Sequence, residues 1–129
     1  MTSIQQRVVA AAVRKDGRFL LCQRPAHKRH GGLWEFPVGK CEPGETDHHA
    51  ITRELAEELN VEVSATGLAL FSASDPASPF VIVFFLVEVR GEPYCIEHAA
   101  IASAPRDELE AHVLAPCDAR FANFLRTSE

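Results

Sequence analysis

The chain has 129 residues, 47% hydrophobic and 24% charged, which is ordinary for one soluble globular domain. Its net charge of −5 makes a nucleic acid polymer an unexpected partner, and no apolar run approaches the ~20 residues needed to cross a membrane. The length predicts a single domain over residues 1–129. The four cysteines are far apart and form no CxxC pair, so we expect reduced thiols and a cytoplasmic location.

The first predicted elements are two strands that form a hairpin. Residues 7–15 and 19–24 are rich in β-forming side chains and flank Lys-Asp-Gly, which favours a tight turn. Residues 25–35 contain Pro, Gly-Gly and several charges and are predicted to be a loop. The following FPVGK is expected to be a short strand or turn. Residues 14–40 carry seven Lys or Arg against two acidic residues, so this region is basic although the whole chain is acidic.

A helix is predicted from Asp47 to Leu59. Thr46 is a suitable N-cap because its hydroxyl can accept a hydrogen bond from an N–H group of the first turn. Apolar residues then recur at helical spacing. Asn60 is expected to end the helix, because Asn tolerates the left-handed conformation that terminates many helices.

The second half of the chain is predicted to contain three strands followed by two short helices. The apolar run FVIVFFLVEVR is expected to be a central strand buried on both faces. Phe121, Phe124 and Leu125 are expected to face inward from the last helix. Strands mixed with helices imply a layered α/β domain. The strands cover residues 61–73, 80–90 and 96–102, a loop covers 74–79, and the helices cover 106–111 and 116–125.

Three carboxylates of the predicted helix 47–59 raise a physical conflict. Glu54, Glu57 and Glu58 fall within an arc of about 100° beside the apolar face. Two of them occupy the last turn, where the helix dipole disfavours each acid by roughly 0.3–1 kcal/mol, and neighbouring like charges add a few tenths of a kcal/mol. Charge runs usually face solvent, but a divalent cation would remove the conflict because hard cations bind carboxylate oxygens.

Residues 39–61, GKCEPGETDHHAITRELAEELNV, resemble the Nudix box, the signature of the Nudix hydrolase family. Asn60 stands where the box has its last Gly, a mild departure because Asn tolerates the left-handed conformation. Around the box, GGLWEFPVGK, GEPYCIEH and Ala-Pro-Cys-Asp (115–118) resemble MutT-like nucleoside triphosphate pyrophosphohydrolases, with departures at Val38 and Ser103. The positions that match the box are Gly39, Glu45, Arg53, Glu54, Leu55, Glu57, Glu58 and Val61.

The resemblance implies a Nudix-type α/β/α sandwich with a mixed β-sheet and a metal-dependent site. Glu54, Arg53 and Glu57 resemble the catalytic set: Glu54 is a metal ligand, the base toward the attacking water, or both, and Arg53 orients the acids. Oxygen-only ligands favour Mg²⁺, or Mn²⁺, over zinc. The implied metal ligands are the side chains of Glu54, Glu57, Glu58 and Glu97 and the backbone carbonyl of Val38.

The resemblance also implies a small-molecule nucleotide as substrate. Arg24 resembles a phosphate contact, and Lys40 is a second candidate for this role. Phe36 is expected either to line the pocket for the base or to pack in the core. Asp118 matches a position that faces the base, with a cap of the C-terminal helix as the alternative.

The implied reaction is hydrolysis of a nucleoside triphosphate, such as 8-oxo-dGTP or a cytidine-type (d)NTP, to the monophosphate and pyrophosphate. One alternative is hydrolysis of a nucleoside diphosphate linked to another group, such as ADP-ribose, since Pro76 lies near where some relatives of that kind carry Pro. The other alternative is a non-catalytic nucleotide-binding module. The sequence leaves both a monomer and a homodimer open.

Overall fold

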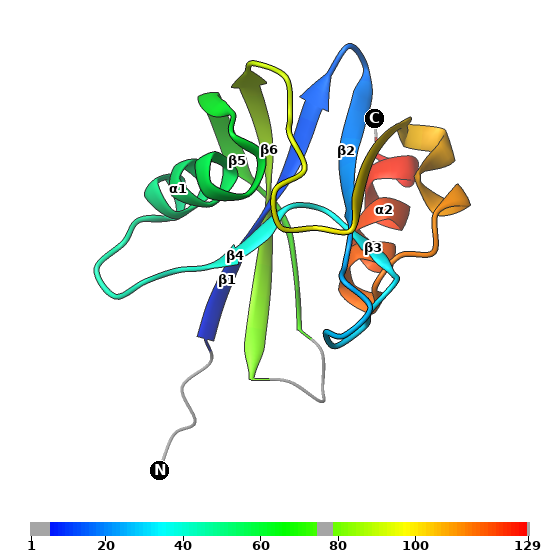
Figure 1. Ribbon diagram of the computed structural model, residues 1–129, viewed down its shortest axis with the longest axis horizontal. Helices are drawn as coiled ribbons and strands as arrows, with labels where there is room; N and C mark the ends of the chain where they lie inside the picture. Colours follow the sequence, from blue (N-terminus) through cyan, green and yellow to red (C-terminus); the bar gives the residue numbers. More distant parts are fainter. Residues whose placement is uncertain (1–5, 75–78, 129) are drawn as a thin grey trace.

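The computed structural model describes residues 6–74 and 79–128 and shows a mixed β-sheet between two helices (Figure 1). In chain order the elements are β1 (Gln6–Lys15), β2 (Arg18–Gln23), β3 (Trp34–Glu35), β4 (Val38–Lys40), α1 (Asp47–Leu59), β5 (Glu62–Ser74), β6 (Phe80–Arg90), β7 (Ala100–Pro105), the 3₁₀ helix η1 (Arg106–Ala111) and α2 (Pro116–Thr127). The strand order is β3-β2-β1-β6-β5, while β4 pairs with β1 and β7 pairs with β2. This arrangement confirms the predicted α/β/α sandwich.

Strand β1 joins the two halves of the sheet. It pairs in parallel with β6 and antiparallel with β2, and its residues from Val8 to Val13 are all buried. The hairpin to β2 turns at Asp16 and Gly17, which both have positive φ (54° and 74°), as a two-residue hairpin turn requires. The predicted hairpin is therefore present.

Each helix packs on its own hydrophobic core. Leu55 and Leu59 of α1 are buried against residues of β1 and β6. On the other side of the sheet, Phe121 of α2 stacks on Phe84 of β6 with 4.3 Å between ring centroids. Full burial of such a side chain contributes about 1.5–3 kcal/mol, so the two cores fix both helices on the sheet.

The ends of α1 are those that the sequence predicts. The Thr46 hydroxyl oxygen accepts a hydrogen bond from the backbone N–H of His49 at 3.1 Å. Asn60 closes the helix in the left-handed conformation, with φ 55° and ψ 41°. The acidic residues of the last turn therefore lie at the carbonyl end of a well-capped helix.

The predicted strand over residues 96–102 is wrong at its start, because β7 begins only at Ala100. Residues 92–99, which we call the strap, instead dock on the end of α1. The N–H groups of Tyr94 and Ile96 donate to the carbonyls of Leu59 (2.8 Å) and Glu58 (3.3 Å). These donors are then not available to a sheet neighbour.

Several smaller differences complete the comparison with the predicted elements. The loop expected over 25–35 ends in β3, and the helix expected over 106–111 is a 3₁₀ helix. Strand β6 is a central strand, as predicted, and lies between β1 and β5. The expectation that both its faces are buried is only partly met, because residues 83–85 and Val87 are buried, most others are half-buried, and Glu88 and Arg90 are exposed. Of the predicted loop over 74–79, residues 75–78 lie outside the described residues. Among the residues that are described, no helix has the length and apolar character needed to cross a membrane.

Candidate active site

Arg53 is the centre of a hydrogen-bond network on α1. Its Nε and Nη2 atoms donate to the two carboxylate oxygens of Glu45 at 2.7 and 2.8 Å, and Nη2 also donates to the carbonyl of Lys40 at 3.1 Å. Its Nη1 atom donates to Glu54 at 2.9 Å and to Glu57 at 3.4 Å. The hydrogen bonds from Arg53 lower the pKa of Glu45 to about 2. Arg53 therefore ties the loop before α1 to two acids of the helix.

Glu58 is a buried acid, with only 9% of its surface exposed. Burial raises its pKa to about 9, and the nearby charges of Glu54 and Glu97 act in the same direction. A hydrogen bond joins Glu58 to Glu54, whose own pKa is raised mainly by burial. The Oε2 atom of Glu58 has no hydrogen-bond partner among the described residues. At neutral pH this pair of carboxyl groups shares a proton.

Gly39 makes room for the side chain of Glu54. A Cβ atom at position 39 would overlap the Cγ and Cδ atoms of Glu54. The backbone of β4 and the acid of α1 thus approach each other as closely as a residue without a side chain permits. The first glycine of the Nudix box is explained by this lack of space.

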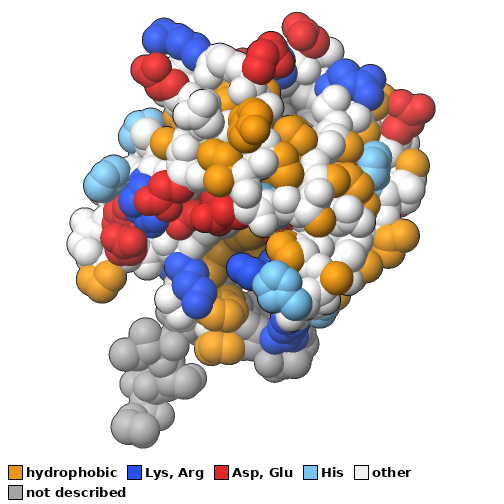
Figure 2. Space-filling view, in the orientation of Figure 1, with side chains coloured by type: hydrophobic (Ala, Val, Ile, Leu, Met, Phe, Trp, Pro, Cys, Tyr) orange, Lys and Arg blue, Asp and Glu red, His pale blue; other side chains and the backbone are white. Residues whose placement is uncertain are grey.

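A cavity of about 360 Å³ opens beside these acids, within the size range of small-molecule sites. Figure 2 shows a group of acidic side chains next to a hollow with hydrophobic side chains, and Lys, Arg and His side chains around its edge. The wall consists of Val8, Arg24, Pro25, Lys28, Arg29, His30, Glu35, Val38, Gly39, Lys40, Glu58, Phe80, Ile82, Glu97, His98, Ala115, Pro116, Cys117 and Asp118.

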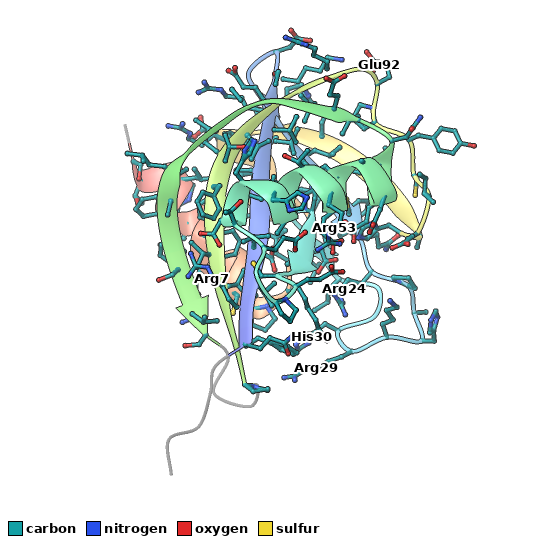
Figure 3. The ribbon with its side chains drawn as sticks, turned by 90° about the vertical axis from the view of Figure 1, so that its left-hand side faces the viewer. Arg7, Arg24, Arg29, His30, Arg53 and Glu92 are labelled. Atoms are coloured by element: carbon teal, nitrogen blue, oxygen red, sulfur yellow. The ribbon has the colours of Figure 1, made fainter. Side chains whose placement is uncertain are left out.

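Most of the site residues that the sequence predicts meet at this cavity. Glu54 lies next to the wall, because it is hydrogen-bonded to Glu58. Glu57 is farther out on the surface, with a side chain that is 56% exposed and bound to Arg53. Figure 3 shows Arg53 and Arg24 on the same side of the molecule. The predicted site residues in the wall are Arg24, Val38, Lys40, Glu58, Glu97 and Asp118.

Glu35 and His98 are two wall residues with buried side chains to which the sequence motif assigns no role. Glu35 is 5% exposed. One of its oxygens accepts a hydrogen bond from Nη1 of Arg24 at 2.8 Å, and the other lies 3.3 Å from Nε2 of His98. Arg24 also donates from Nε to the carbonyl of Arg29 at 2.6 Å, so only its remaining N–H groups are available to a phosphate. The signal in the sequence is an acid set between the aromatic residues Trp34 and Phe36.

Asp118 is held at the cavity by a hydrogen bond to another part of the chain. It is 6% exposed, and its Oδ1 atom accepts the N–H of Phe36 at 2.9 Å. Burial, together with the charge of Glu35, raises the pKa of Asp118 to about 8. The N-cap position of α2 belongs to Ala115. Asp118 is therefore not the N-cap residue, although its carboxyl group accepts its own backbone N–H in the first turn of α2.

Phe36 does not line the cavity, and the expectation that it lies beside a base is wrong. Its ring is fully buried, 5.0 Å from the ring centroid of Phe121 in the core under α2. Successive side chains of an extended chain face opposite sides, so Glu35 faces the cavity while Phe36 faces the core. The wall instead contains Phe80, whose ring centroid lies 4.9 Å from Nζ of Lys40.

The acids fit a hard divalent cation once their shared proton is lost. Across the described part of the chain, the side chains as they stand form no group of three or more His, Cys, Asp or Glu able to hold a metal ion. They form no such group because Glu58 is hydrogen-bonded to Glu54, and Glu57 accepts a hydrogen bond from Arg53. Deprotonation would leave the unpartnered Oε2 atom of Glu58 in need of a positive partner. Carboxylate and carbonyl oxygens are what Mg²⁺ and Mn²⁺ prefer.

Comparison with known proteins gives the same picture. The sequence profile of the NUDIX domain family matches residues 4–124. A CTP pyrophosphohydrolase of Escherichia coli (strain K12) is 38% identical over 114 residues, which cover 86% of this chain and 84% of that protein. An 8-oxo-dGTP diphosphatase of Proteus vulgaris is 40% identical over 74 residues, which cover 57% of this chain and 66% of that protein. The solution structure of the E. coli ORF135 protein has 36% identity and a TM-score of 0.77, covering 92% of this chain and 86% of that one.

The family match and the relatives named as pyrophosphohydrolase and diphosphatase indicate a hydrolase that acts on phosphoric anhydrides. The chain belongs to the Nudix family, as the box in residues 39–61 predicts. Members of this family generally use divalent metals. The family assignment favours an enzyme over the non-catalytic module.

Proposed function

We propose that the protein hydrolyses a nucleoside triphosphate to the nucleoside monophosphate and pyrophosphate, with a cytidine-type triphosphate as the first candidate and 8-oxo-dGTP as the second. The observation that carries this proposal is one cavity whose wall contains both metal-type acids, Glu58 and Glu97, and a buried polar group suited to a base, Asp118. The relative named CTP pyrophosphohydrolase supports the first candidate, since 84% of its length aligns with this chain. The relative named 8-oxo-dGTP diphosphatase supports the second.

The residues that would hold a divalent cation are Glu54, Glu57, Glu58 and Glu97, together with the carbonyl of Val38. When bound, Mg²⁺ or Mn²⁺ would screen the phosphate charge and activate the attacking water. Arg53 already fixes Glu54 and Glu57 by hydrogen bonds of 2.9 and 3.4 Å, so the acids need little rearrangement to act together.

The chain supplies a proton acceptor and a positive wall for the reaction. Hydrolysis forms a bond between the water oxygen and a phosphorus atom, breaks the P–O bond of the α–β anhydride, and removes a proton from water. We assign the role of proton acceptor to Glu54, whose pKa is raised by burial. Arg24 and Lys40 line the same cavity and attract the triphosphate.

Asp118 is the residue that would read the base. Its Oδ1 atom accepts the N–H of Phe36, and the carboxyl group also accepts its own backbone N–H, so the base would meet the remaining hydrogen-bonding positions of the group. With a pKa of about 8, this carboxyl group is mainly protonated at neutral pH and can donate to an acceptor such as N3 of cytosine or O6 of an oxidised guanine. A wrong base would leave a buried polar group unpaired, which costs about 1–3 kcal/mol.

The test measures kcat/KM for CTP, dCTP, dGTP and 8-oxo-dGTP at fixed Mg²⁺ in the wild type and in three variants. Asp118→Ala should change the ratio among bases by roughly 1–3 kcal/mol, and it should also lower stability, because the N–H of Phe36 loses its acceptor. Asp118→Asn keeps that acceptor and replaces the carboxyl O–H with an N–H donor, so it is the matched control: it should retain both stability and the ratio among bases. Glu57→Gln should depress all substrates alike.

A uniform loss across bases in Asp118→Ala would show that Asp118 is structural and that the base is read elsewhere. ADP-ribose belongs in the same panel as the alternative substrate, since Pro76, on which that alternative rests, lies outside the described residues. A cytoplasmic enzyme fits the four free cysteines and a nucleotide substrate. The choice between monomer and homodimer stays a prediction that light scattering would decide.

A further inference from the structure

The strap, residues 92–99, carries Glu97 across the mouth of the acid cluster. Figure 1 shows it in yellow, running from β6 past the end of α1 and on to β7. Its backbone is anchored on both sides of Glu97: the N–H of Ile96 donates to the carbonyl of Glu58 at 3.3 Å, and the N–H of Ala99 donates to the carbonyl of Gln23 at 3.0 Å. Glu97 and His98 lie between these anchors, and both belong to the cavity wall.

Glu97 is not held in place by attraction to the other acids. Its charge acts on Glu58 and raises the pKa of that group, as do the charges of Glu54 and Glu35. In the metal-free protein, the cluster therefore repels the residue that the strap presents to it. The backbone anchors hold the strap on both sides of Glu97, and a side-chain contact between them would fix it further.

The side chain of His98 provides such a contact. It is 7% exposed, and its Nε2 atom lies 3.3 Å from an oxygen of Glu35, which is itself 6% exposed and paired with Arg24 at 2.8 Å. A carboxylate only accepts hydrogen bonds, so Nε2 of His98 carries the proton and donates it. The Nδ1 atom is buried and has no hydrogen-bond partner among the described residues. The orientation of this ring thus depends on the one bond to Glu35.

We propose that His98 is a positioning residue: through its bond to Glu35 it holds Glu97 beside Glu58, so that the strap completes the metal-binding set. This inference rests on the proposed metal-dependent function. Because Glu35 also binds Arg24, the same carboxylate links the strap to another residue of the cavity wall. Outer groups that fix metal-binding residues in this way typically account for 10–100-fold in metal affinity or activity.

Three variants isolate the bond between His98 and Glu35. His98→Gln retains an N–H donor at nearly the reach of Nε2, whereas His98→Asn is shorter and loses the bond. His112→Asn is the matched control. His112 also has a buried Nδ1 without a partner in the described part of the chain, but its ring packs at 4.9 Å on Trp34 and lies outside the cavity wall.

The first readout is the affinity for Mn²⁺ in the absence of nucleotide, which is measured from the electron paramagnetic resonance signal of free Mn²⁺. We expect His98→Asn to weaken binding about tenfold or more, and His98→Gln and His112→Asn to stay within about threefold of the wild type. In the metal-free protein, hydrogen exchange at residues 97–98 should quicken in His98→Asn alone. In the wild type, ¹⁵N NMR of the imidazole should show the proton on Nε2, a result that does not depend on the folding of any variant.

Wild-type Mn²⁺ affinity in His98→Asn, or a proton on Nδ1 of the wild-type ring, would overturn the proposal. So would equal losses in His98→Asn and His112→Asn, because they would indicate a general loss of packing. The proposed function fails separately. If the wild type binds Mn²⁺ in a His98-dependent way but releases no pyrophosphate from any triphosphate, the positioning role stands and the nucleotide reaction does not.

Discussion

Replacing Glu58 with Gln removes a titratable group from the acid cluster and keeps its shape. The folded chain holds the Glu58 proton up to a pKa of about 9, against an ordinary value of 4.5. Between these pH values the folded state binds more protons than the unfolded state, so the metal-free protein loses stability as the pH rises. At pH 7 this retained proton lowers the free energy of unfolding by up to about 3 kcal/mol, at 1.36 kcal/mol for each pH unit above 4.5.

Glu58→Gln should therefore stabilise the metal-free protein at pH 7 and have little effect near pH 4.5. A gain of about 3 kcal/mol corresponds to a Tm increase on the order of 10 °C for a chain of this size. Thermal melts in EDTA at both pH values measure it. In the same variant, Mg²⁺-dependent pyrophosphate release should fall by about 100-fold or more, because a carboxylate of the metal-binding set is lost.

Glu57→Gln is the matched control, since Glu57 is 56% exposed and touches Arg53 at 3.4 Å. It should lose turnover without a comparable gain in Tm. If Glu58→Gln melts at the wild-type temperature at both pH values, the burial argument for Glu58 is refuted. If it keeps a near-normal kcat at limiting Mg²⁺, Glu58 does not belong to the metal-binding set.

Two further substitutions test the geometry of the cavity. Gly39→Ala should displace Glu54, because the new Cβ would overlap its side chain; we expect kcat to fall by at least about tenfold, a loss of 1.4 kcal/mol or more, and wild-type kcat would refute the close approach. Phe36→Ala should lower stability by about 3–5 kcal/mol in urea unfolding, whereas Phe80→Ala should raise KM with little loss of stability; the reverse pattern would contradict the assignment of Phe36 to the core and Phe80 to the wall.

The sequence predicted those elements whose signals are local. The ends of α1 follow from Thr46, which caps the first turn, and from Asn60, which adopts the left-handed conformation. The bounds of β6 follow from a mostly apolar run. The acid cluster was also readable, because spacing along a helix fixes which side chains share a face.

The features that the sequence did not reveal depend on contacts between distant segments. The strap leaves the sheet because its N–H groups find the carbonyls of Leu59 and Glu58, more than thirty residues earlier. The bond from the N–H of Phe36 to Asp118 joins residues 82 positions apart. By contrast, the opposite orientations of Glu35 and Phe36 follow from alternation along an extended chain, and that signal was present in the sequence.

The helix dipole pointed to the acids of α1, although it is the smaller of the two effects that disfavour them. The conflict visible in the sequence is the helix dipole, which disfavours each acid in the last turn by roughly 0.3–1 kcal/mol. The larger conflict is burial, which at Glu58 reaches up to about 3 kcal/mol at pH 7 and depends on how β4 and the strap cover the helix end. A cation that binds here must displace the Glu58 proton, so its affinity rises with pH up to about 9. The raised pKa of Glu58 therefore lowers the stability of the metal-free protein, and at neutral pH it also opposes metal binding by the cost of releasing that proton.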